Sequence, residues 1–179
     1  MKRLLLVLLA ALTLAGCVQM EAVYPAVDEI FDKYTVHDDL FFRAAQEALA
    51  MEGDLFISTT AYYQPQNAKE ISGLYVSDVK ETSVRALENQ PIATLFEMCD
   101  VKSMATRKEG ELQACEFNCG GSGNYYCGVY YVSEDKPLYI GNFSAQLSPS
   151  GQGFSYEGNG VRYFTQKISP HFYYFDAQT

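Results

Sequence analysis

The segment 115–131, CEFNCGGSGNYYCGVYY, decides the fold. Two apolar stretches that carry cysteines flank a Gly-Gly-Ser-Gly-Asn run, which is typical of a β-hairpin. Residues that face each other in an antiparallel hairpin have numbers with a constant sum, and they share one face of the sheet. Pairing Cys119 with Cys127 centres the turn on Gly123. We therefore predict a hairpin in this register, closed by a Cys119–Cys127 disulfide.

A second hairpin precedes this one. Cys99 and Cys115 have their midpoint at Arg107, inside the polar run 105–110. Four of the five cysteines lie within 99–127, and an even number favours disulfides if the chain is exported to an oxidising compartment, as its first residues indicate below. We predict a Cys99–Cys115 disulfide, so that two disulfides cross a three-stranded meander. The shared register also sets Cys115 opposite Tyr131.

Tyrosine is unusually abundant, with 14 Tyr and 11 Phe but no Trp. A Tyr ring offers a large contact area and a hydroxyl group at its rim, which suits interfaces. The segment 124–133 has aromatic residues on both faces of a predicted strand. Such a strand is either buried on both sides or displays its rings to a partner. We predict a partner-binding surface at Tyr125, Tyr126, Tyr130 and Tyr131, with the filling of a β-rich core as the alternative.

Upstream of the hairpins the periodicity is helical. Apolar residues at i, i+3, i+4 and i+7 predict a helix over about 25–34. An interruption at 35–37 precedes a second helix, which Asp38 or Asp39 caps and Gly53 ends.

The remaining segments are rich in β-branched and aromatic residues and are separated by turn clusters. We predict strands over 55–63, 70–76, 124–133, 137–147, 153–157, 161–168 and 172–175. Residues 78–89 fit either a short helix or a strand; we choose the helix, which Pro91 would end, and expect only strands from Ile92 onward. The predicted fold is α+β, with two N-terminal helices packed on a mostly antiparallel, disulfide-stapled β-sheet.

The start of the chain has the features of an export signal. Two basic residues precede an apolar run over 4–12, shorter than the roughly 20 residues that a membrane-spanning helix needs. The tetrad Leu14-Ala15-Gly16-Cys17 follows, and it resembles the lipobox of bacterial lipoproteins at every position. The resemblance implies that residues 1–16 are a signal peptide, that Cys17 carries a diacylglycerol anchor in the membrane, and that residues 17–24 form a lipidated tether.

The residue after Cys17 indicates which membrane holds the anchor. Val18 stands where the family's inner-membrane retention signal has Asp, so we expect the outer membrane, with the protein facing the periplasm. Residues 25–179 are enough for a single α+β domain with its own core. Loss of residues 1–16 reduces the basic residues from 13 to 11 against 22 acidic ones, a net charge of −11. Nucleic acid is a poor partner for such a chain, whereas a cationic protein would be attracted.

These features favour a binding protein over an enzyme. The two histidines, His37 and His171, lie in no nucleophile motif, and each unlipidated cysteine has a predicted disulfide partner. Zinc held by the cysteines and histidines is the rival, but the chain has neither a C-x-x-C nor an H-x-x-x-H pair, and we expect no metal and no cofactor. We predict a non-catalytic lipoprotein that binds another envelope protein as an accessory assembly subunit.

Two alternatives stay open. Residues 159–163, NGVRY, following SPSG at 148–151, resemble the loop region of membrane-bound lysozyme inhibitors of the C type, which implies an inhibitor of a cationic enzyme such as lysozyme. The cysteine spacing and the N-terminal helices do not fit that family, so no residue roles are transferred. A peptidoglycan-active hydrolase would need two carboxylates, and an acidic chain supplies many candidates.

Overall fold

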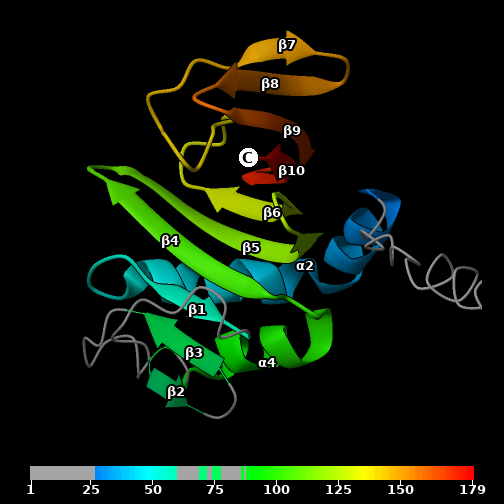
Figure 1. The fold of residues 1–179 in the computed structure, drawn as a ribbon. Helices are drawn as coiled ribbons and strands as arrows, with labels where there is room; N and C mark the ends of the chain where they lie inside the picture. The colour runs from blue at the N-terminus through cyan, green and yellow to red at the C-terminus, as the bar shows by residue number, and fades with distance from the viewer. Residues whose placement is uncertain (1–26, 60–68, 72–73, 78–85, 87) are drawn as a thin grey trace, which may run out of the picture.

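The computed structural model describes residues 27–59, 69–71, 74–77, 86 and 88–179 (Figure 1). The predicted signal peptide, Cys17 and the tether lie outside these residues. The described elements are α2 (Val27–Ala50), β1 (Phe56–Ser58), β2 (Lys69–Ile71), β3 (Leu74–Ser77), α4 (Gln90–Cys99), β4 (Ser103–Glu109), β5 (Leu112–Ser122), β6 (Tyr125–Val132), β7 (Ser148–Ser150), β8 (Gly153–Gly158), β9 (Val161–Ser169) and β10 (Phe172–Gln178).

The strands form one sheet in the order β2-β3-β1-β4-β5-β6-β10-β9-β8-β7. The strand pairs along it are antiparallel, which confirms the α+β class and the antiparallel sheet. The last strand, β10, is central: it pairs with β6 on one side and β9 on the other. Helix α2 runs behind β4 and β5 in Figure 1, and α4 lies beside it.

Helix α2 is bent where the sequence predicts an interruption. His37 has non-helical backbone angles (φ −126°, ψ 22°) inside a helix that otherwise runs from Val27 to Ala50. The Thr35 hydroxyl donates to the Phe31 carbonyl at 2.7 Å, just before the bend. The buried residues of α2 recur at helical spacing on either side of the bend: Ile30, Tyr34, Leu40, Phe41, Ala44, Ala45 and Ala48.

The second helix, α4, corrects the prediction, because it is not N-terminal and it occupies a segment expected to be strand. Pro91 begins this helix rather than ending one, since proline lacks the N–H group that a first turn leaves unpaired. The Asn89 side chain caps it by accepting from the Ile92 N–H, and Asp100 ends it in a left-handed conformation. Most of the predicted helix at 78–89 lies outside the described residues, as does the end of the strand predicted over 55–63.

The β5–β6 hairpin has the predicted register in its first half. Cys115 faces Tyr131 and Phe117 faces Val129, as expected. A bulge between Asn118 and Gly120 then shifts the pairing, so that Gly120 rather than Cys119 faces Cys127. Bulges insert one extra residue on one strand, and nothing in the hydrophobic alternation signals this one.

The β4–β5 hairpin corrects the other register. Thr106 faces Cys115, and the turn lies at Gly110, which has a φ of 65°. Cys99 ends α4 and belongs to no strand, so it cannot face Cys115 across a hairpin. All four cysteines in the described residues, Cys99, Cys115, Cys119 and Cys127, are buried free thiols, so the sheet carries neither predicted disulfide.

Each face of the sheet has its own core. The first lies between the sheet and the two helices and includes Phe41, Leu95 and Phe117. The second lies on the opposite face, beneath the segment 133–147, and includes Tyr130 and Phe175. We predicted a strand within this segment, but it is irregular. Part of its backbone bonds to side chains: Leu138 N–H donates to the Tyr130 hydroxyl, and the Tyr163 hydroxyl donates to the Leu138 carbonyl, each at 3.1 Å.

Candidate binding groove

The segment 133–147 leaves part of the second sheet face uncovered. A hollow of about 330 Å³ lies there. Its lining comes from β1, β4, β5, the β5–β6 turn, β6 and the end of the chain, and we call it the Glu116 groove: Phe56, Ser103, Glu116, Asn118, Gly123, Tyr126 and Thr179. A second hollow, of about 370 Å³, adjoins it and shares four of these residues.

Strand register explains why these side chains meet. Ser103 faces Asn118, while Phe56 and Glu116 face the same residue, Ala105, from the strands on either side of it. Cross-strand partners share a face of the sheet. The alternate residues of β4, Met104 and Thr106, are buried on the helix side. The groove therefore consists of two neighbouring cross-strand rows on the face away from the helices.

The hairpin bulge completes the groove. Beyond it, Gly121 faces Tyr126, which puts the Tyr126 ring on the groove face. Gly121 has a φ of 145°, and a Cβ atom there would lie 2.3 Å from the Tyr125 carbonyl oxygen. Only glycine fits such a position without moving the backbone.

Among the residues that line the groove, Glu116 is the one with a carboxyl side chain. It is half-buried, and it takes part in no hydrogen bond or ion pair with the residues that the structure describes. Burial raises the pKa of its carboxyl group from 4.5 to about 7. A perturbed carboxyl group inside a concave site is a recognised sign of function.

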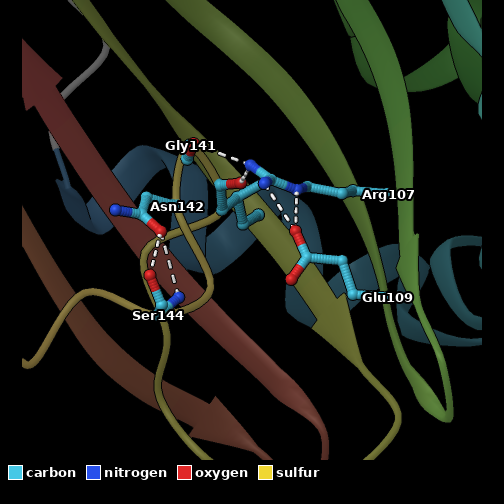
Figure 2. Close-up of polar contacts among 6 residues, drawn as sticks. Arg107, Glu109, Gly141, Asn142 and Ser144 are labelled. Carbon is cyan, nitrogen blue, oxygen red and sulfur yellow. Dashed lines mark hydrogen bonds and ion pairs between the residues drawn. The ribbon is translucent and has the colours of Figure 1, made fainter.

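Arg107, a diagonal neighbour of Glu116 on the same sheet face, is engaged elsewhere (Figure 2). Its guanidinium donates to the Ile140 carbonyl at 2.9 Å and the Gly141 carbonyl at 2.6 Å. It also forms a two-pronged contact with Glu109. Figure 2 shows the Arg107 side chain directed to Glu109 and Gly141, and its bonds to the Ile140 and Gly141 carbonyls fix the segment 133–147 to the sheet.

The four tyrosines predicted to bind a partner divide into two pairs. Tyr130 and Tyr131 are buried on opposite faces of the sheet, so the core-packing alternative holds for them. Tyr130 shares a hydrogen bond with Thr165 at 2.9 Å, and Tyr131 packs against Phe172. Tyr125 and Tyr126 are half-buried and line the hollows.

The described cysteines and histidines form no reactive centre. Burial raises the pKa of Cys119 to about 12 and that of Cys127 to about 11, and it also raises the pKa of Cys115 and Cys99. Buried thiols of this kind are poor nucleophiles. His37 lies at the bend of α2 and His171 in the β9–β10 turn. Among the residues that the structure describes, no group of three or more His, Cys, Asp or Glu side chains is arranged to hold a metal ion.

From the sequence we named Tyr126, which lines the groove, but we did not name four other lining residues: Glu116, Asn118, Ser103 and Phe56. The available signal was the position of Glu116, a charged residue between Cys115 and Phe117 in a predicted strand. In a central strand such a residue needs a solvated or functional environment.

No protein-family model, curated protein or solved structure matches the chain. In the part of the chain that the structure describes, no helix has the length and apolar character needed to cross a membrane. The class that the fold defines is an α+β protein with helices on one sheet face and an open groove on the other.

Proposed function

We propose that this protein is a non-catalytic lipoprotein of the bacterial outer membrane, anchored through Cys17 and facing the periplasm, which binds another envelope protein through the Glu116 groove. The observation that carries the proposal is the groove itself. It is an open concavity with aromatic side chains from two distant elements, Phe56 and Tyr126, in a chain whose residues 14–17 resemble a lipobox.

The composition of the groove supports binding. Half-buried aromatic rings supply much of the energy of protein interfaces, and polar groups beside them fix orientation. Here Asn118 and Ser103 supply the polar groups. The groove is also wider than one side chain, because the adjoining hollow extends it along the β5–β6 turn. An accessory subunit of an envelope assembly would use such a surface to hold a loop or a terminus of its partner.

Inhibition of a cationic enzyme such as lysozyme is the second candidate. The net charge of −9 favours such a target. Residues 159–163 include the exposed β8–β9 turn, where Asn159 and Gly160 both have positive φ angles. Excess purified lipoprotein should then reduce the lysis of cell walls by lysozyme, and unchanged lysis would remove this candidate.

Site-specific photo-cross-linking tests the main proposal. A benzophenone amino acid replaces Tyr126 in the full-length lipoprotein, and the matched control carries it at Phe42, which is 45% exposed on α2, on the other side of the sheet. We expect one discrete cross-linked protein at Tyr126 and none at Phe42, with the product reduced in a Cys17→Ser form. Equal products at both positions, or none at Tyr126, would contradict a partner in the groove.

A further inference from the structure

The Glu116 groove contains a carboxyl group that none of the described residues neutralises. Glu116 is the one residue of its lining with a charged side chain, and among the described residues it has no hydrogen-bond or ion-pair partner. A half-buried carboxylate loses part of its hydration, and without a hydrogen-bond or ion-pair partner this loss is not compensated. Positive charge from a ligand would restore the missing interaction.

The nearby cations are engaged with other groups. Arg107 bonds to Glu109 and to two carbonyl groups of the segment 133–147. Lys102 pairs with Asp100, and Lys108 donates to the Met51 carbonyl. Each of these three described cations thus has a partner other than Glu116, although Arg107 is a diagonal neighbour of Glu116 on the same face.

The walls of the groove suit a cation with an aliphatic stem. Phe56 and Tyr126 offer apolar and aromatic surface, against which the methylene groups of Lys or Arg can pack while the charged end reaches a polar partner. Asn118 and Ser103 can accept the further hydrogen bonds of an ammonium or guanidinium group.

We infer that the groove binds a lysine or arginine side chain from a basic segment of the partner protein, with its charged end at Glu116 and its stem between Phe56 and Tyr126. This inference rests on the proposed function and names the chemistry of the partner. The acidic surface of the chain, with 22 acidic against 13 basic residues, would also attract such a segment from a distance.

The test uses short glycine-serine peptides that carry one central lysine, arginine or norleucine. Norleucine keeps the aliphatic stem without the charge. Each peptide is titrated into the isotope-labelled full-length lipoprotein in detergent, and the amide chemical shifts report both the place and the strength of binding. We expect the lysine and arginine peptides to change the amide chemical shifts of Ser103, Asn118 and Tyr126. The norleucine peptide should bind with an affinity about tenfold lower.

Two variants identify the group responsible. Glu116→Gln keeps the shape of the side chain and should lower the affinity for the lysine peptide by about tenfold. Glu111→Gln removes an exposed carboxylate from the nearby β4–β5 turn and should leave binding unchanged. Equal binding of lysine and norleucine, no binding of any peptide, or equal affinity for the Glu116→Gln form would each overturn the inference.

Failure of this inference and failure of the proposed function give different results. If the cross-link at Tyr126 persists at full yield in the Glu116→Gln protein, the groove binds a partner but does not recognise its charge. If the lysine peptide binds through Glu116 while no protein cross-links at Tyr126, the groove recognises cations, and the proposed protein partner is wrong.

Discussion

Glu116 links the stability of the protein to pH. Its pKa is 4.5 when exposed and about 7 in the folded protein, so the folded state holds more protons between these values than the unfolded state. The free energy of unfolding therefore falls as pH rises through 7. We expect Glu116→Gln to raise the free energy of unfolding by about 2 kcal/mol at pH 8 and to change it little at pH 4. Denaturant unfolding at a series of pH values measures both.

The matched control for this prediction is Glu111→Gln, which removes an exposed carboxylate. It should change the free energy of unfolding by less than about 0.5 kcal/mol at every pH. The charge of Glu116 also affects the pKa of two tyrosines, Tyr139 and Tyr163. Both titrate above this pH range, because burial raises their pKa. Parallel pH profiles for the Glu116→Gln and wild-type proteins would show that Glu116 is not the titrating group.

The four described cysteines yield a second prediction. At pH 8 a thiol with a pKa of about 12, such as that of Cys119, is a thiolate in only about one molecule in ten thousand. We expect a maleimide to label none of the four in the folded protein and all four after unfolding without a reductant, as mass spectrometry would show. Labelling that required a reductant would instead contradict the free thiols of the structure.

At the scale of elements, one aspartate holds the β9–β10 turn. Asp135, with a φ of 46°, accepts from the His171 N–H at 2.7 Å, from Lys167 at 2.8 Å and from the Tyr173 hydroxyl at 3.2 Å. His171 itself has a φ of 66°. We expect Asp135→Ala to lower the free energy of unfolding by about 1 kcal/mol, because these donors lose their acceptor.

Asp135→Asn should lower the free energy of unfolding less than Asp135→Ala does, since asparagine tolerates the left-handed conformation and still accepts a hydrogen bond. Glu134→Ala is the control, because Glu134 is exposed and, among the described residues, its side chain pairs with Lys136 alone. Lys167 and the His171 N–H lower the pKa of Asp135, so its contribution should disappear as pH falls below the ordinary range of aspartate. Thermal unfolding of the three variants at pH 7 and pH 3 measures this effect. If the ranking of their melting temperatures were the same at both pH values, the role of Asp135 would be purely steric.

Elements with local signals could be predicted from sequence. The bend at His37, the first half of the β5–β6 register and the β8–β9 turn all follow from capping residues, alternation and glycine. Helix α4 was missed because Pro91 fits both the end of one helix and the start of another, and only the buried spacing of Ile92, Leu95, Phe96 and Cys99 decides between them.

Features that depend on distant residues could not be predicted. The segment 133–147 has apolar residues with the alternation of a strand, but Arg107, Tyr130 and Tyr163 bond its backbone, so it pairs with no strand. The same segment determines which part of the sheet face stays open. From the sequence we named Tyr126 because tyrosine is abundant in the chain. The exposure of Glu116, in contrast, depends on where this covering segment ends.

At the scale of the whole molecule, the position of β10 makes the sheet one unit. This strand joins β6 to β9, and its residues contribute to both cores: Phe172 and Tyr174 to the helix-side core, Tyr173 and Phe175 to the opposite one. Removal of β10 would therefore separate β7–β9 from the rest of the sheet. We accordingly expect residues 27–179 to unfold as one cooperative domain.

Native-state hydrogen exchange measures this cooperativity. The amides of β6 and β10, which are paired on both sides and largely buried on both faces, should exchange slowest and with a common free energy. Those of the edge strand β7, which is exposed and contains Pro149, should exchange much faster. Adding denaturant should bring β5, β6, β9 and β10 to one unfolding isotherm. If β8 and β9 opened on an isotherm of their own while β4 and β5 stayed protected, the chain would contain two folding units and β10 would not unite them.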